Sequence, residues 1–230
     1  MLRLFIAAAL VLAAIACPAV AADPGPGETV TFSASDGTLL SGVWRGGSDR
    51  VVILSHQYDQ DQTSWAPLVA RLEEAGYATL TYNFRGYPPS QGQRVISELG
   101  RDLDAAVAFA RSRGATHLTL IGASMGGIAT VPAALTAAPD AYVTISAPTG
   151  FSGLEAPDDA LAASPAAKLF INSENDDYIA DTRHMAEVAA EPRTLSVYPT
   201  GLHGVLLFLT PDGERLLDEI TDFVKANMPL

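Results

Sequence analysis

The stretch LTLIGASMGG, residues 118–127, places a serine between two glycines directly after an apolar-leaning run. If the run is a strand and the next residues begin a helix, Ser124 lies at a turn too sharp for ordinary side chains nearby. Such a turn suits a nucleophile. A Gly-x-Ser-x-Gly segment on its own is equally compatible with a flexible turn, so the rest of the chain has to distinguish the two interpretations.

The bulk composition is typical of one folded domain. The 230 residues are 48% hydrophobic and 17% charged, which provides one full core and little excess for a second. The net charge of -12 argues against a nucleic-acid partner, because no basic stripe exists to neutralise phosphates. A small-molecule substrate is compatible with this charge.

The first 21 residues have the pattern of an export signal. Arg3 precedes an unbroken apolar run from residue 4 to about residue 17, and Ala19-Val20-Ala21 is a small-residue cleavage signature. The run is short for a hydrocarbon core about 30 Å thick and has no basic stop-transfer flank. We therefore expect a signal peptide at 1–21, a flexible leader at 22–28, a folded domain at 29–230, and a periplasmic or secreted protein.

Cys17 is the only cysteine of the chain. It ends the segment Ala14-Ile15-Ala16-Cys17, which resembles a bacterial lipobox without the usual leucine at its first place. A lipid anchor at Cys17 is the alternative to cleavage after Ala21, and membrane attachment is expected only in that case. With cleavage after Ala21 the mature chain has no disulfide, and its stability must come from core packing.

Strand and helix patterns alternate along the folded domain. A hairpin is predicted across the turn Asp36-Gly37. Strands are predicted at 29–35, 38–44, 51–55, 78–82, 117–121, 141–145, 168–171 and 194–198, and helices at 65–75, 98–113, 125–138, 179–190 and 211–227. Because most strands are continuous apolar runs with helices between them, we expect an α/β fold with a mostly parallel sheet covered on both faces.

Chemically versatile side chains follow several of these strands. They are His56-Gln57-Tyr58, Ser124, Asp176 and His203. In an open parallel sheet, ligands bind beyond the carboxyl ends of the strands. The chain order of serine, aspartate and histidine is the order required when nucleophile, acid and base follow successive strands of such a sheet.

Five segments together resemble the α/β-hydrolase family, and the resemblance extends from about residue 51 to the final helix. They are LSHQYDQDQTSW (54–65), YNFRGYPPSQG (82–92), GASMGG (122–127), NSENDDYIA (172–180) and GLHG (201–204). The resemblance implies an α/β-hydrolase domain at 29–230 that acts through an acyl-enzyme without a cofactor. The chain is similar to small cap-less serine esterases and to the dienelactone-hydrolase-like branch. That branch normally uses a cysteine nucleophile, so Ser124 favours carboxylic ester or thioester hydrolysis.

The resemblance makes Ser124 the nucleophile and His203 its base. A serine hydroxyl is a poor nucleophile near neutral pH and needs a base within hydrogen-bond reach. His203 stands between two glycines in a loop after a strand. His117 opens a strand at the opposite end, and His184 lies within a predicted helix, so neither has a path to Ser124.

The acid is expected at Asp176. Residues 173–179 look like the family's Gly-x-x-Asp-x-x-Val turn, with Ser173 in the place of the glycine. A carboxylate at that position would hold the imidazole of the base in one tautomer. Asp177 and Glu174 are the alternatives.

Two backbone N–H groups, of Met125 and Tyr58, are implied as the oxyanion hole. Fixed donors stabilise the charge that develops on a carbonyl oxygen. Family members often carry His-Gly before the second donor, whereas this chain has His56-Gln57, so the identity of the second donor stays open. His56 itself is interpreted as a residue that braces the loop.

Other segments are interpreted as scaffolding. Residues 83–87 resemble the family's Asp-x-Arg-Gly-x-Gly segment with Asn83 in place of the acid, and Arg85 is expected to hydrogen-bond nearby loops. Trp44 and Trp65 are expected in the core. No metal site is predicted, because the histidines lack ligand spacing and there are no cysteine pairs.

The segment 147–167 is too short and too rich in proline and glycine for a large cap. We therefore expect an open site, with Phe151, Leu154 and Tyr178 as candidate substrate walls; anchoring of the loops is the alternative role for these three residues. An open site suits small esters, acyl groups presented on a larger molecule, and thioesters. A peptidase for small peptides and a non-catalytic binding protein on the same scaffold are the competing hypotheses.

Overall fold

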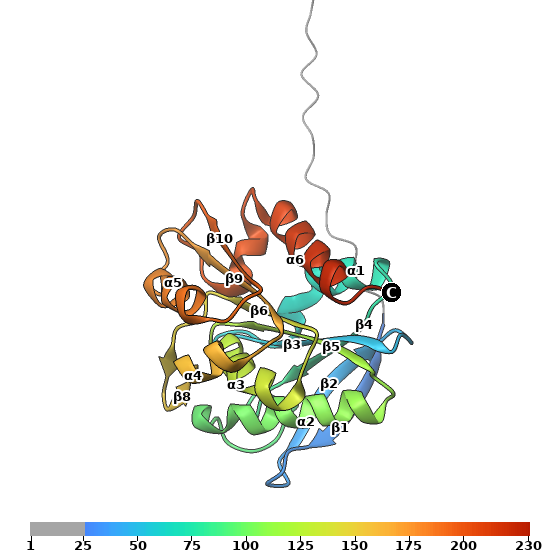
Figure 1. Cartoon of the computed structure of the whole chain (residues 1–230). Helices are drawn as coiled ribbons and strands as arrows, with labels where there is room; N and C mark the ends of the chain where they lie inside the picture. The colour runs from blue at the N-terminus through green and yellow to red at the C-terminus, as the bar shows by residue number, and fades with distance from the viewer. Residues whose placement is uncertain (1–25) are drawn as a thin grey trace, which may run out of the picture.

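The computed structural model of the chain describes residues 26–230. Within them, one eight-stranded sheet has the order β1-β2-β4-β3-β5-β6-β9-β10 (Figure 1). The strands are β1 (Glu28–Ser33), β2 (Leu39–Arg45), β3 (Arg50–Ser55), β4 (Ala78–Asn83), β5 (His117–Ala123), β6 (Ala141–Ile145), β9 (Ala167–Ser173) and β10 (Arg193–Tyr198). β2 pairs antiparallel with β1 and with β4, and all other neighbours are parallel. The predicted mostly parallel α/β-hydrolase fold is confirmed.

Helices cover both faces of this sheet. On one face α1 (Ala66–Glu74) and α6 (Gly213–Asn227) lie side by side, and on the other α2 (Leu99–Ser112) packs beside α3 (Met125–Ala137) (Figure 1). The short α4 (Asp158–Ala163) and α5 (Ile179–Val188) extend the second layer over β9. Three short 3₁₀ helices, η1 (Gln62–Trp65), η2 (Ile96–Glu98) and η3 (Gly204–Leu209), complete the helices of residues 26–230.

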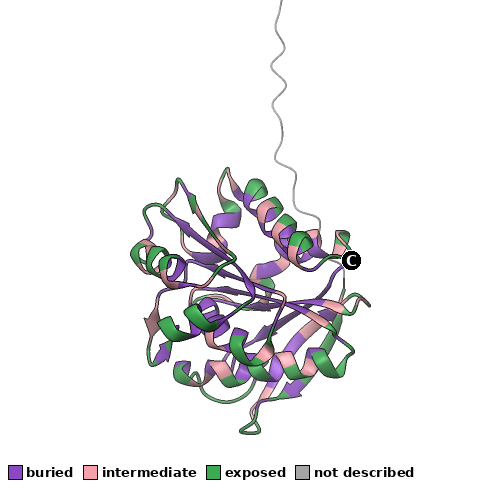
Figure 2. Ribbon diagram, in the orientation of Figure 1, coloured by how far each residue is buried: buried purple, intermediate pink, exposed green. Residues whose placement is uncertain are grey.

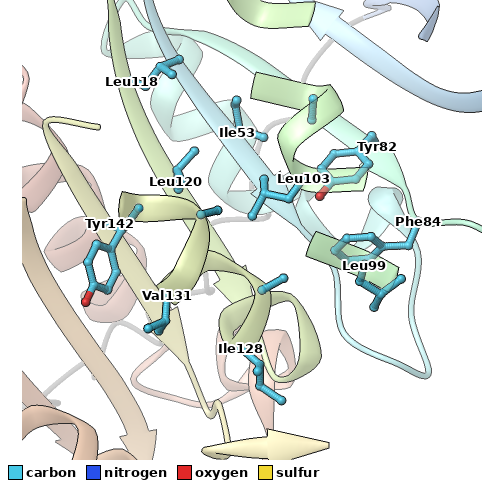
Figure 3. Close-up of a cluster of buried hydrophobic side chains, with 14 of the residues drawn as sticks. Ile53, Tyr82, Phe84, Leu99, Leu103, Leu118, Leu120, Ile128, Val131 and Tyr142 are labelled. Atoms are coloured by element: carbon cyan, nitrogen blue, oxygen red, sulfur yellow. The ribbon is translucent and has the colours of Figure 1, made fainter. Parts of the chain in front are cut away.

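The core consists of two apolar layers, one on each face of the sheet. Successive side chains of a strand point to opposite faces, so Val51 and Ile53 of β3 pack under α2 and α3, whereas Val52 and Leu54 pack under α1 and α6. The central strands are accordingly buried, while the outer faces of the helices are exposed (Figure 2). Figure 3 shows the layer beneath α2 and α3, where Leu103 and the ring of Tyr142 belong to the same cluster.

The element boundaries differ from the sequence prediction by no more than two residues, but the segment between β6 and β9 contains elements that were not predicted. β7 (Gly150–Phe151) and β8 (Leu154–Glu155) form a small hairpin, followed by α4. Its turn residues, Ser152 and Gly153, both have positive φ, of 50° and 82°. Strands of two residues are too short to show a recognisable alternation of apolar and polar residues in the sequence. No large cap is present in the described part of the chain.

The predicted signal peptide at 1–21, the lipidation alternative at Cys17 and most of the leader lie outside the described residues. β1 begins at Glu28, the last residue assigned to the leader. Between residues 26 and 230, no helix has the length and apolar character needed to cross a bilayer.

Candidate active site

Ser124 occupies a sharp turn between β5 and α3. Its φ of 49° and ψ of -117° are unusual for a residue with a side chain. A Cβ added at Gly122 would lie 2.2 Å from the carbonyl oxygen of Gly126, and one added at Gly126 would lie 2.2 Å from that of Ser55. Both glycines are therefore needed for α3 to start this close to β5 and β3. The Ser124 N–H donates to the Ile145 carbonyl at 2.8 Å, which fixes the turn.

The Ser124 hydroxyl neither caps a helix nor forms a side-chain hydrogen bond within the described residues. Although Ser124 is the N-cap residue of α3, its hydroxyl does not cap the helix. It is half-buried, and among residues 26–230 it forms no side-chain hydrogen bond, to His203 or to any other residue. The hydroxyl therefore stands unengaged at the N-terminus of a 13-residue helix, where the partial positive charge of the helix dipole is greatest.

Asp176 and His203 form a hydrogen-bonded pair in the loops after β9 and β10. The distance from Asp176 Oδ2 to His203 Nδ1 is 2.7 Å. Asp176 is 5% exposed, and its other carboxylate oxygen accepts the Tyr178 N–H at 2.7 Å. Because a carboxylate faces Nδ1, the proton of a neutral imidazole belongs on Nδ1 and Nε2 is left to accept a proton.

Main-chain hydrogen bonds hold these two loops together. The Glu174 N–H donates to the Tyr198 carbonyl at 2.8 Å, and the Asn175 N–H donates to the Thr200 carbonyl at 3.0 Å. The side chains of Glu174 and Asp177, the alternative acids, are exposed and make no hydrogen bond to His203 within the described residues. Of the three carboxylates, the structure brings only Asp176 to His203.

The remaining histidines have other partners. His117 Nδ1 lies 2.9 Å from Asp140, and His184 Nε2 lies 2.9 Å from Asp158. His56 is fully buried: its Nε2 accepts the Phe84 N–H at 3.1 Å, and its Nδ1 faces the Gln57 carbonyl at 2.7 Å. Burial lowers the pKa of His56 to about 4, which keeps the ring neutral.

The neutral ring of His56 uses both nitrogens to brace the loop after β3. Nδ1 carries the proton and donates it, while Nε2 accepts. His56 therefore has no free nitrogen for proton transfer, in agreement with its interpretation as a bracing residue.

Met125 and Tyr58 offer two unused backbone donors. Neither N–H donates to a protein acceptor within residues 26–230. The Tyr87 hydroxyl donates to the Tyr58 carbonyl at 2.7 Å and lies 3.9 Å from the Met125 sulfur. One phenol thus touches both residues whose N–H groups are candidates for the oxyanion hole. From the sequence, Tyr87 was predicted only as part of a scaffolding segment, because its two partners, in the loop after β3 and at the start of α3, are distant in the chain.

Two of the three candidate substrate walls lie near these groups. The Tyr178 ring is 37% exposed and its centroid lies 5.5 Å from that of His203; together they border a pocket of about 150 Å³. The Phe151 ring packs edge-on against Tyr58, with 5.5 Å between centroids. Leu154 was predicted as a third wall, but it is 5% exposed and belongs to the core cluster beneath α3. The β7–β8 hairpin packs against α3, and this contact buries Leu154.

The scaffolding residues behave as expected. Arg85 is buried, and its guanidinium and backbone bind the carboxylate of Asp102, with a further bond of 2.8 Å to Asp36. Trp44 and Trp65 belong to the two core clusters. Across the described residues, no group of three or more His, Cys, Asp or Glu side chains is arranged to hold a metal ion.

Comparison with protein families gives a match to the model described as serine aminopeptidase, S33, over residues 46–173, more than half of the chain. The uncharacterized protein YfhR of Escherichia coli (strain K12) is 30% identical over 115 residues, which are 46% of this chain and 40% of the relative. YfhR of Salmonella typhi is 29% identical over 114 residues, 45% of this chain and 39% of the relative. The chain thus matches less than half the length of these curated relatives.

Solved structures share the fold over almost the whole described chain. The Pyrococcus furiosus esterase Pf2001 has a TM-score of 0.74 at 21% identity, covering 88% of this chain and 93% of that one. XC6422 from Xanthomonas campestris, a serine hydrolase without a lid, has a TM-score of 0.70 at 19% identity, covering 89% of this chain and 96% of that one. At such identities the likeness establishes the common fold.

Proposed function

We propose that this chain, which belongs to the serine aminopeptidase S33 family of α/β hydrolases, hydrolyses carboxylic esters through an acyl-enzyme. Thioesters are included among the expected substrates. The observation that carries the proposal is the Asp176–His203 pair at the same end of the sheet as the strained turn of Ser124. Nucleophile, base and orienting acid are the groups that this reaction needs.

In the first half of the proposed reaction, His203 Nε2 removes the proton from Ser124 Oγ while Oγ attacks the carbonyl carbon of the substrate. The imidazolium that forms is stabilised by Asp176, whose carboxylate lies 2.7 Å from Nδ1. The oxygen of the tetrahedral intermediate carries the negative charge and accepts hydrogen bonds from the N–H groups of Met125 and Tyr58. Catalytic hydrogen bonds of this kind often become short only with substrate bound, which is compatible with the unbonded Ser124 hydroxyl.

The intermediate then collapses, and His203 returns its proton to the departing alcohol or thiol. The acyl group remains on Ser124 Oγ as an ester. A water molecule gives a proton to His203 and attacks the acyl carbon. When the second intermediate collapses, the carboxylic acid is released and His203 returns that proton to Ser124 Oγ, which restores the serine. Ester, alcohol, acid and water balance without a cofactor.

The expected substrate is a small ester or an acyl group presented on a larger molecule. The hairpin β7–β8 and the short helix α4 leave the carboxyl end of the sheet without a large cap. The ring of Phe151 packs against Tyr58 and that of Tyr178 against His203, and we propose that both rings contact the substrate.

A peptidase acting on small peptides is the second candidate, favoured by the description of the matched family as a serine aminopeptidase. The same three residues can cleave an amide, provided that His203 protonates the departing amine. Matched p-nitrophenyl ester and p-nitroanilide substrates with one acyl group separate the two, because an esterase is expected to turn over only the ester at a useful rate.

Labelling with a fluorophosphonate probe tests the proposal directly. Wild type is expected to react, Ser124→Ala and His203→Ala are expected to lose labelling, and the control His117→Ala, which lies in another part of the sheet, is expected to retain it. Labelling that persists in folded Ser124→Ala would refute the assignment of the nucleophile. A folded wild type that neither labels nor hydrolyses p-nitrophenyl esters would instead favour a binding protein on this scaffold.

We propose in addition that the protein is exported. The support is the pattern of residues 1–21, with the lipidation alternative at Cys17. Expression of the full chain in a Gram-negative host is expected to yield a periplasmic product that begins after Ala21. Loss of a membrane-bound fraction in Cys17→Ser would favour lipidation instead.

A further inference from the structure

Two side chains from other elements hold the loop that carries His203, one on each side of the histidine. The Gln57 side-chain carbonyl accepts the Val205 N–H at 2.9 Å. On the opposite flank, the Ser173 hydroxyl donates to the Leu202 carbonyl. Gln57 follows β3 and Ser173 ends β9, so the two contacts reach the loop from different strands.

These are the hydrogen bonds that join the main chain of residues 201–205 to other elements in the described structure. Two further bonds of this stretch are local: the Leu202 N–H donates to Thr200 Oγ1 at 3.3 Å, and the Leu206 N–H donates to the His203 carbonyl at 3.2 Å. Gly201 and Leu202 are exposed, whereas Gly204 and Val205 are buried, and Val205 belongs to the core cluster that also contains residues of α6. Val205 anchors the end of the loop by packing, and the polar contacts that fix the part around His203 come from the two side chains and from Asp176.

Gln57 is fixed at both ends of its amide. It is 1% exposed, and its Nε2 donates to Asp59 Oδ1 at 2.8 Å. A Cβ added at Gly204 would lie 1.9 Å from Gln57 Oε1, and Gly204 has a φ of 60°. The amide thus packs directly on the main chain next to His203, and only a glycine leaves room for it.

Both contacts are made by the side chain, so neither would exist with a glycine at position 57 or 173. Ser173 is completely buried, so its hydroxyl has no access to water as an alternative partner. The two contacts converge on one loop.

We propose that Gln57 and Ser173 are positioning residues that together hold His203 for proton transfer with Ser124, an inference that rests on the proposed ester hydrolysis. Because Gln57 directly precedes Tyr58, the same contact fixes the base relative to a candidate oxyanion donor. Loss of either side chain lets the loop shift, which slows acylation more than it weakens substrate binding.

The test compares Gln57→Leu, Ser173→Ala and their combination with two matched controls. Gln60→Leu makes the same change in the same loop at a side chain without a hydrogen bond, and Ser164→Ala removes a buried hydroxyl that has no partner within the described residues. With a p-nitrophenyl ester as substrate, kcat is expected to fall about tenfold or more in each single variant and KM to change less than about twofold. Both controls are expected to match wild type.

A rescue variant separates positioning from simple loss of packing. In Gln57→Glu/Asp59→Asn the new carboxylate still accepts from the Val205 N–H, and the bond between positions 57 and 59 is restored with its donor and acceptor exchanged. We expect kcat to return to within about threefold of wild type, because the hydrogen-bonded geometry is restored. Unchanged kcat in both Gln57→Leu and Ser173→Ala, or no recovery in folded Gln57→Glu/Asp59→Asn, would overturn the proposal.

We call the two contacts that Gln57 and Ser173 make to the loop of His203 the clamp. A measurement without substrate distinguishes failure of the clamp from failure of the proposed reaction. In ¹⁵N NMR spectra of the imidazoles, the His203 signals are expected to shift or broaden in the double variant Gln57→Leu/Ser173→Ala, while those of His117 stay unchanged. Unaltered His203 signals would overturn the clamp even in an active enzyme. Altered signals in a protein whose wild type cleaves no ester would support the clamp and refute the hydrolase assignment.

Discussion

The loops after β3 and after β10 each carry a histidine at the same end of the sheet, in opposite environments. His56 has no exposed surface and uses both ring nitrogens for main-chain partners. The His203 side chain is 29% exposed and uses only Nδ1, toward Asp176. A position after a strand thus brings a side chain to the site, but the number of unused ring nitrogens decides whether it can transfer a proton. The predictions below test this distinction.

The largest effect is expected from removing the charge that orients His203. In Asp176→Asn the amide can hold the imidazole in the wrong tautomer, and kcat is expected to fall by about 10⁴, the loss seen when the carboxylate of such a triad becomes an amide. Asp177→Asn is the matched control, because Asp177 is the exposed neighbour with no bond to His203. The measurement is kcat of both variants with a p-nitrophenyl ester. An equal loss of kcat in the two would contradict the assignment of Asp176 as the acid.

The fold and the place of the candidate residues directly after the strands could be predicted because they depend on local patterns. The apolar run before Ser124 is continuous since β5 is buried on both faces, and Gly122 and Gly126 are required by close backbone approach. Such constraints are imposed on single positions in the chain. They are visible without knowledge of distant neighbours.

The contacts that complete the site could not be predicted in this way. The bond from Gln57 to Val205 joins residues 148 positions apart, and the bond from Tyr87 to Tyr58 joins two loops. The burial of Leu154 was not predicted for the same reason, because it results from packing of the β7–β8 hairpin against α3. Spacing locates such residues near the site, and tertiary packing determines their partners.

The second expected effect is on stability and concerns the bracing histidine. His56→Leu leaves the Phe84 N–H and the Gln57 carbonyl without their partner in a buried loop, and we expect the free energy of unfolding to fall by about 2–4 kcal/mol. His117→Leu, which breaks a partly exposed pair with Asp140, is expected to cost less than about 1 kcal/mol. Urea denaturation measures both; equal losses would show that the ring of His56 does not brace the loop.

The third effect is the pH dependence that burial of His56 imposes. Its pKa is about 4 in the folded protein, against 6.5 for an unperturbed histidine. Between these values the unfolded chain binds a proton that the folded chain does not, so this contribution destabilises the protein as the pH falls from about 6.5 to about 4 and levels off below. The stability advantage of wild type over His56→Leu is therefore expected to shrink by on the order of 3 kcal/mol between pH 7 and pH 4. A constant difference across denaturation curves in that range would contradict the neutral, buried ring.

The smallest effect is expected from the Tyr87 hydroxyl, which contacts both Tyr58, in the loop of His56, and Met125. Tyr87→Phe removes the hydrogen bond to the Tyr58 carbonyl, and Tyr77→Phe removes an equivalent bond, from Tyr77 to the Met228 carbonyl at 2.9 Å, far from the site. Each change is expected to cost about 1 kcal/mol of stability. Only Tyr87→Phe should also lower kcat, by about fivefold to tenfold, because the Tyr58 peptide then loses the contact that aims its N–H. If both variants lose stability and neither loses rate, Tyr87 supports the loop without orienting the donor, and the second oxyanion donor must be sought at another N–H of this loop.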